Sequence, residues 1–231
     1  MSDDHSLDRR SFCRHAAWLG AGLAAVPAAL AAAARADESL GDATTPAQAL
    51  QRLRDGNARF VDGKTIAPAR DLAHLRATAP KQTPFAAFLG CADSRVPVEI
   101  LYDQGFGDLF VVRVAGNVAT PLEIASLEYG AAVLGTRVIK VLGHSNCGAV
   151  KAAMSGGEVP GQISALFSHI VPAINRKTMD LDAAIAANVR YQAANLRRSS
   201  PLLGRLKREG KLDIVGGVFS LETGTVKPVD L

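Results

Sequence analysis

The sequence predicts an α/β fold, in which a mostly parallel central sheet of four to five strands is flanked by helices. Two short apolar runs, at 84–90 and 137–143, each end in a glycine and are typical of strands buried on both faces. Segments with helical patterns separate the apolar runs, and this alternation requires parallel strands joined by right-handed crossovers. Hydrophobic residues make up 48% of the 231 residues, which is enough to bury one good core.

Capping and turn residues predict the individual elements. Proline at an early helical position predicts helices that begin near Pro46, Pro97 and Pro121. Further apolar runs predict strands that end before turns. The expected order is a helix from 46, a connection over 63–82, a strand over 84–90, a short helix over 96–102, a strand over 109–115, a helix over 120–135, a strand over 137–143, a helix over 147–154, helices over 160–209, a strand over 212–219 and a last short strand after a turn at 222–225.

The chain is predicted to contain a signal peptide at 1–36, a polar linker at 37–45 and a single domain at 46–231. The formal charge of +4 and the pI near 9.1 are compatible with nucleic-acid binding. Aromatic residues are only 5% of the chain, and no basic run with interleaved aromatics occurs. We therefore expect no nucleic-acid partner.

The N-terminal segment predicts export by the twin-arginine pathway. The pattern RRSF at 9–12 precedes a weakly hydrophobic stretch over 16–34, and cleavage is expected after Ala36. An uncleaved anchor helix is the alternative, but Pro27 and the alanine-rich composition make it a poor membrane span. We expect a protein that is exported folded, is periplasmic or secreted, and has no stable membrane anchor after cleavage.

Two segments carry residues suited to metal chemistry, CADSR at 91–95 and HSNC at 144–147. Each segment directly follows one of the two apolar runs. The carboxyl ends of parallel strands converge on the crevice where open α/β sheets bind ligands, so the two segments are able to meet. Cys91, His144 and Cys147 are ligands of the kinds that catalytic zinc takes, with a fourth position left for water.

Asp93 and Arg95 are expected to act beside this metal. In an extended segment, Cys91, Asp93 and Arg95 share one face and point into the same crevice. A bidentate pair with Arg95 holds Asp93 ionised, so that Asp93 either accepts a proton from zinc-bound water or takes the place of that water on the metal. A purely structural ion pair is one alternative. Helix capping by Asp93, Ser145 and Asn146 is another.

At these residues the chain resembles the β-class carbonic anhydrases. Cys-x-Asp-x-Arg followed by His-x-x-Cys is the metal and gate signature of that family. Three further stretches are similar and occur in the same order: LRDGNARF at 53–60, DLFVVRVAGN at 108–117 and SLEY at 126–129. The resemblance covers about residue 46 to the C-terminus, and it implies the fold described above.

The resemblance implies a zinc enzyme, with one Zn²⁺ per chain, that reversibly hydrates CO2 to bicarbonate and a proton. In that chemistry zinc hydroxide attacks CO2, and the pair of Asp93 and Arg95 orients the zinc-bound water. Asp93 would ligate the metal only in a closed form of the site. Phe88 stands where members with a noncatalytic bicarbonate site have tryptophan, so we expect the plant-like, open-site form.

The resemblance also implies a substrate pocket and an oligomer. Gln82 matches a glutamine that hydrogen-bonds the substrate, and Phe110 and Tyr129 match aromatics that wall the pocket. A surface amide and two core aromatics are the alternative interpretations. A homodimer or a tetramer of dimers is expected, in which the helix from Pro46 packs on a second subunit or on its own core.

Other functions are compatible with parts of this pattern. A hydrolase of CS2 or COS would use the same metal ligands. A noncatalytic, zinc-stabilised interaction module would leave Asp93 and Arg95 unexplained. A disulfide between Cys91 and Cys147 suits an exported protein but leaves His144 without a role. A thiol redox protein is least favoured, because no Cys-x-x-Cys pair is present.

Overall fold

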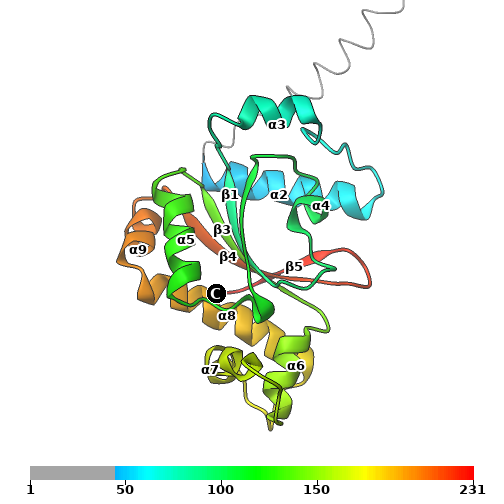
Figure 1. The fold of residues 1–231 in the computed structure, drawn as a ribbon, viewed down its shortest axis with the longest axis vertical. Coiled ribbons are helices and arrows are strands. Elements are labelled where there is room, and N and C mark those ends of the chain that lie inside the picture. The colour runs from blue at the N-terminus through cyan, green and yellow to red at the C-terminus, as the bar shows by residue number, and fades with distance from the viewer. Residues whose placement is uncertain (1–44) are drawn as a thin grey trace, which may run out of the picture. The chain divides into compact units, whose positions relative to one another are not determined.

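A computed structural model describes residues 45–231, all of which belong to one compact unit (Figure 1). The predicted signal peptide and all but one residue of the predicted linker lie outside the described residues. No helix in the part of the chain that the structure describes is long and apolar enough to span a membrane.

Five strands form one sheet in the order β2-β1-β3-β4-β5. The first four strands in this order run parallel, and β5 pairs antiparallel with β4. The predicted, mostly parallel α/β fold is therefore confirmed. The strands are β1 Ala86–Gly90, β2 Leu109–Arg113, β3 Val138–His144, β4 Asp213–Phe219 and β5 Val226–Val229.

Helices precede, connect and follow these strands. Two of the helices, which begin at Pro46 and Pro121, start with a capping box. In this motif a threonine and the residue three positions later each cap the other's backbone with a side chain, as Thr45 and Gln48 do. The helices are α2 Pro46–Val61, α3 Leu72–Thr78, α4 Val98–Leu101, α5 Pro121–Ala132, α6 Gly148–Ser155, α7 Phe167–Ile170, α8 Leu181–Ser199 and α9 Pro201–Arg208. Three 3-10 turns are η3 Ala115–Asn117, η4 Ile163–Leu166 and η5 Val171–Ala173.

Some expected boundaries were wrong. The connection over 63–82 contains the helix α3, which Asp71 caps by accepting a hydrogen bond from the His74 backbone N–H. The helix expected over 96–102 is a single turn, α4. The helices expected over 160–209 are present, as α7, α8 and α9 together with the 3-10 turns η4 and η5. The two errors, at α3 and α4, concern short segments whose helical signal spans only one or two turns.

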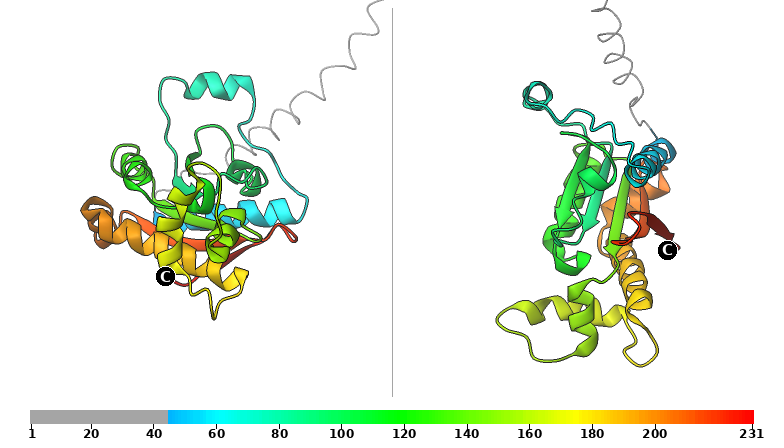
Figure 2. Two further views of the ribbon diagram at one scale, coloured as in Figure 1. Left: turned by 60° about the horizontal axis from the view of Figure 1, so that its bottom comes forward. Right: turned by 90° about the vertical axis from the view of Figure 1, so that its right-hand side faces the viewer.

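Each face of the sheet has its own core. Alternate residues of a strand point to opposite faces, so Leu89 packs with α5, α8 and α9 whereas Phe88 packs with α2 and α4. A third cluster, formed by α6, α7 and α8, includes Cys91 and Cys147. Figures 1 and 2 show α6 and α7 beyond one end of the sheet and α3 beyond the other.

Glycine at position 143 allows α8 to lie directly on β3. A Cβ atom on Gly143 would come within 2.7 Å of Val189 Cγ2 and 3.2 Å of Ile185 Cγ2, both in α8. Any larger residue would push α8 away from the sheet. The glycine that ends the predicted strand therefore determines how closely this helix approaches the end of β3.

Lys140 is an unusual member of the core. It lies in β3 on the α2 side, is 7% exposed, and has its Nζ 5.7 Å from the centroid of the Tyr102 ring. Burial, with a smaller effect of the charge on Arg54, lowers the pKa of Lys140 to about 8. The folded protein therefore disfavours the charged form of this lysine.

We expect Lys140→Met to stabilise the fold at pH 7 by about 2 kcal/mol, because it removes a buried charge. In the parent protein the pKa falls from 10.5 to about 8 on folding. Between pH 8 and 10.5 the unfolded chain therefore binds more protons than the folded protein. The free energy of unfolding rises with pH across this window, and this gain is lost as the pH falls through 8. Urea unfolding at pH 7 and 9.5 measures both effects. Lys151→Met, at an exposed position, is the control, and an equal pH dependence in both variants would contradict the prediction.

Candidate metal centre

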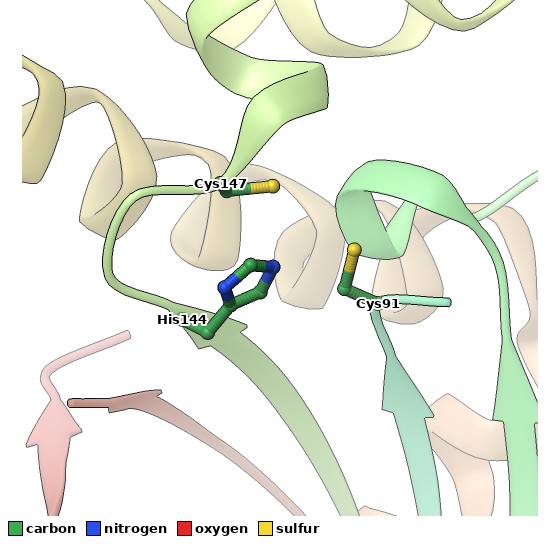
Figure 3. A group of neighbouring side chains, drawn as sticks. All are labelled: Cys91, His144 and Cys147. Atoms are coloured by element: carbon green, nitrogen blue, oxygen red, sulfur yellow. The ribbon is translucent and has the colours of Figure 1, made fainter. Parts of the chain in front are cut away.

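Three potential metal ligands converge beyond the carboxyl ends of β1 and β3. Cys91 follows β1, His144 is the last residue of β3, and Cys147 is the residue before α6. One donor atom from each lies within 4.8 Å of the others, and all three residues are buried. Figure 3 shows the three side chains directed toward one another. The fold therefore brings together the two segments, 91–95 and 144–147, that the sequence analysis identified as carrying metal ligands.

The ring of His144 is oriented by a backbone contact. Its Nδ1 lies 3.0 Å from the Ser145 carbonyl oxygen, which can only accept, so Nδ1 carries the proton. The other ring nitrogen, Nε2, is buried and has no hydrogen-bond partner. An unpaired buried acceptor is costly in an apolar core. It is also the atom that a metal ion would take, since ligating histidines are held in this way.

Cys91 and Cys147 are free thiols in contact with each other, which contradicts the disulfide interpretation. The hydrogen bond from Cys147, opposed by burial, lowers the pKa of Cys91, and His144 and the Gly116 backbone lower it further. The same contact, together with burial, raises the pKa of Cys147. A divalent cation at this point would stabilise both thiolates.

The donor set fits zinc. Sulfur and nitrogen ligands about 2.0–2.3 Å from a tetrahedral ion are about 3.3–3.8 Å apart, so small rotations of these side chains close the group around one metal. Two thiolates and one imidazole are a ligand set known for catalytic zinc, and they leave the fourth position open. The unpaired Nε2 of His144 is the observation that favours a metal over plain packing.

Asp93 and Arg95 form a bidentate pair. The Arg95 Nε donates to Asp93 Oδ1 at 2.9 Å, and Nη2 donates to Oδ2 at 2.8 Å. These side-chain bonds hold the pKa of Asp93 well below its usual range, and the same partner raises the pKa of Arg95. Asp93 therefore remains a hydrogen-bond acceptor at every moderate pH.

The expectation of an extended segment from Cys91 to Arg95 was wrong. The chain turns at Asp93, where the Arg95 backbone N–H also donates to Asp93 Oδ1 at 2.9 Å. The turn brings the guanidinium back onto the carboxylate while Arg95 stays 51% exposed. Asp93 Oδ2 lies 3.8 Å from His144 Nε2, so the carboxylate stands next to the group formed by Cys91, His144 and Cys147.

The capping interpretation is also contradicted. The residue before α4 is Pro97 and the residue before α6 is Cys147, and neither cap makes a side-chain hydrogen bond. The Ser145 hydroxyl instead accepts from the Leu221 backbone N–H at 2.9 Å. Ser145 thus ties the ligand-bearing loop to the segment that follows β4.

Gln82, Phe110 and Tyr129 lie away from the metal ligands of the same chain. Gln82 and Tyr129 line a hollow of about 510 Å³ that none of the three ligands lines. Phe110, near the start of β2, packs against Tyr129 with ring centroids 6.2 Å apart. These side chains sit toward the amino ends of β1 and β2, whereas Cys91 follows the carboxyl end of β1. A single chain therefore does not join the predicted pocket to the metal group.

Sequence reasoning missed two groups that hold the site. Arg113, the last residue of β2, donates to the Cys91 carbonyl at 2.9 Å and to the Asp93 carbonyl at 2.6 Å. The Gly116 backbone N–H donates to Cys91 Sγ at 3.4 Å. Both residues lie in the stretch at 108–117 that resembles the family, but no sequence pattern assigned either of them a contact with Cys91.

Comparisons with known proteins agree on one family. The sequence model of the carbonic anhydrase family matches residues 86–226, which include β1, all three ligands and most of the sheet. A carbonic anhydrase of Mycolicibacterium smegmatis is 39% identical over 192 residues, covering 80% of this chain and 93% of that protein.

Solved structures identify the class of carbonic anhydrase that the chain resembles. The β-carbonic anhydrase of Coccomyxa, in complex with acetazolamide, matches with a TM-score of 0.61 at 29% identity, covering 76% of this chain and 83% of that one. One of two tetrameric β-carbonic anhydrases from Sordaria macrospora matches with a TM-score of 0.60 at 25% identity, covering 68% and 86%. With its five-stranded sheet and its Cys, His and Cys group, the chain belongs to the β-class carbonic anhydrase family.

Proposed function

We propose that this protein catalyses the reversible hydration of CO2 to bicarbonate and a proton, with one zinc ion per chain held by Cys91, His144 and Cys147. The observation that carries the proposal is the buried group of three donors within 4.8 Å, with the paired carboxylate of Asp93 at its edge. The names of the relatives support the same reaction.

Zinc bound at this group would lower the pKa of a water molecule and so make a hydroxide nucleophile available at moderate pH. The chain's own contribution is orientation and protection. His144 presents Nε2 because Nδ1 is bonded to the Ser145 carbonyl. The three donors are between 0 and 4% exposed, so bulk water is largely excluded from them.

Asp93 is proposed to orient the attacking water. Both of its oxygens are engaged by Arg95, which keeps the carboxylate turned toward the guanidinium and ionised. An ionised carboxylate accepts a hydrogen bond from the water and leaves the oxygen lone pair directed at CO2. We propose the open-site form, in which Asp93 does not ligate the metal. The bidentate pair and the buried Phe88, which replaces a tryptophan, support this form.

A second copy of the chain is proposed to complete the substrate pocket. Leu122 and Tyr129 of α5 and Val133 at its C-terminal cap are exposed, at 78%, 49% and 65%. The two acidic residues of this helix are half-buried and bonded within the chain, Glu123 to Thr120 and Glu128 to Ser200. β2, beside this helix, is an edge strand with only β1 as its neighbour. Both features favour burial against another molecule.

In the proposed homodimer, Gln82, Phe110 and Tyr129 of each subunit face the metal group of the other. A two-fold axis near the β2 edge brings the amino end of one strand toward the carboxyl end of its mate, because an isologous interface pairs each patch with itself. The tetramers named for Sordaria macrospora are consistent with further pairing of dimers.

We also propose that residues 1–36 direct export of the folded, metal-loaded protein by the twin-arginine pathway, leaving a single domain at 46–231 after a short linker. Loading before export would shield both thiols from an oxidising compartment. N-terminal sequencing of the exported protein tests the cleavage after Ala36, and a protein that retains Met1 would remove this proposal.

The function itself is tested by stopped-flow CO2 hydration with residues 37–231, with zinc measured on the same sample. We expect about one zinc per chain, and loss of activity in parallel with zinc when a chelator removes it, because zinc supplies the nucleophile. Restoring zinc should restore the rate. A fully zinc-loaded protein that does not hydrate CO2 anywhere between about pH 6.5 and 9 would overturn the proposal.

Asp93→Asn is expected to keep zinc and lose about 10²-fold in turnover, because the amide has one donor edge and cannot hold the water in a single orientation. Zinc content and CO2 hydration are measured together. Asp62→Asn, at an exposed aspartate that follows the C-terminal end of α2, is the control. Undiminished turnover in Asp93→Asn would remove this residue from the mechanism.

Subunit mixing tests the shared pocket. Gln82→Ala and Asp93→Asn chains are each expected to be impaired, yet a heterodimer of the two has one site with both native residues if Gln82 acts across the interface. Random exchange should then restore about a quarter of wild-type activity. Mixing Asp93→Asn with Arg95→Ala is the control, because both defects stay within one chain's site and no recovery follows. A Gln82→Ala mixture that shows only the mean of its parents would contradict the shared pocket.

A further inference from the structure

The turn η3 lies directly beside the metal group. Its central residue, Gly116, has φ 74° and donates its backbone N–H to Cys91 Sγ, and the next residue, Asn117, has φ 45°. The sequence permits this turn, because glycine adopts the left-handed region freely and asparagine tolerates it better than most residues, but it does not impose the turn, since both residues have other allowed conformations. Something outside the turn must therefore hold this conformation.

Packing explains why the residue is glycine but not why the turn stays in place. A Cβ atom on Gly116 would lie 2.7 Å from Ile170 Cδ1 and 3.3 Å from Ala149 Cβ. Apolar walls on that side prevent any larger residue. They do not direct the peptide N–H at the sulfur, because apolar contacts have no directional preference.

Two buried amides of α8 provide the direction. Asn188 Nδ2 donates to the Gly116 carbonyl at 2.9 Å, and Gln192 Nε2 donates to Asn188 Oδ1 at 2.9 Å. Gln192 also donates to the His169 carbonyl at 2.8 Å and accepts from the Ala119 backbone N–H at 3.0 Å. Since Asn188 Oδ1 accepts from Gln192, only the NH2 group of Asn188 is left to face Gly116.

Both amides are completely buried. Burying two amide groups costs free energy unless their hydrogen bonds offset the loss of contact with water. Apolar residues at the same positions would have no such cost. Neighbouring positions of α8 on this face, such as Val189 and Leu196, are apolar. The amides therefore lie on the part of α8 that packs against the η3 turn, and this turn contacts the ligand Cys91.

We propose that Asn188 and Gln192 are positioning residues for the metal centre: they fix the η3 turn so that the Gly116 N–H bonds the sulfur of Cys91 and holds it in line for the metal. This inference rests on the zinc site proposed above. A hydrogen bond to a ligating sulfur restrains its direction and draws off part of its charge, so the pair would govern how firmly the metal is retained.

The test compares zinc release to a chelator from the zinc-loaded parent and its variants, together with the NMR resonance of cadmium substituted at the site. Asn188→Ala should release zinc at least about tenfold faster, within the range that loss of an outer partner costs. The cadmium resonance should shift, because the environment of one thiolate changes. Asn188→Asp, which keeps the shape but cannot donate to the Gly116 carbonyl, should behave similarly.

Asn195→Ala is the matched control. Asn195 lies on the same face of α8 and donates to the Ala119 carbonyl at 2.9 Å, three residues beyond Gly116. It should leave zinc release and the cadmium resonance close to those of the parent. Equal effects in Asn195→Ala and Asn188→Ala would mean general loosening of α8 and would overturn the inference, as would an unshifted resonance in Asn188→Asp. A parent protein that binds no zinc would instead overturn the proposed function.

Discussion

The candidate site depends first on the parallel register of β1 against β3. In that register Gly90 faces Leu142, so Cys91 and His144 emerge side by side where the two strands end. A slip of one residue would turn His144 to the opposite face of the sheet and separate it from Cys91. Gly143 adds to this constraint, since it lets α8 lie close against β3 at the last residue before the histidine.

Burial is the second determinant of the site's chemistry. Cys91 and Cys147 lie in the cluster formed by α6, α7 and α8, and His144 is fully buried as well, so an unpaired thiolate or imidazole is costly here. Their hydrogen bonds come largely from backbone groups, namely the Ser145 carbonyl and the Gly116 N–H. Arg113 holds the loop through two carbonyls in the same way. Backbone partners of this kind preorganise a site because they cannot rotate away.

Asp93 differs from the three donors because it stands at the border between this dry cluster and solvent. Its partner Arg95 is half exposed, and the turn that joins the two residues makes the side-chain pair a local structure. The substrate pocket is the opposite case. Its predicted residues come from the loop before β1, from β2 and from α5, and none of them reaches the metal ligands of its own chain. The proposed chemistry therefore combines a local ion pair with a pocket that forms only when two subunits assemble.

The sequence by itself determined the parallel sheet, the ligand types and the ion pair, because apolar periodicity, strand-end glycines and the spacing of Cys91 to Arg95 are properties of short segments. The same local reasoning failed where the signal was shorter than about two helical turns, as in α3, or where Asp93 bent the chain. Only the tertiary structure decided which distant groups meet the ligands and which do not. Arg113 and Gly116 contact Cys91, and Asn188 and Gln192 reach Cys91 through Gly116, whereas Gln82, Phe110 and Tyr129 lie away from the three ligands. Their positions follow from how helices pack on the sheet, and that packing is the sum of many contacts that no single stretch of sequence contains.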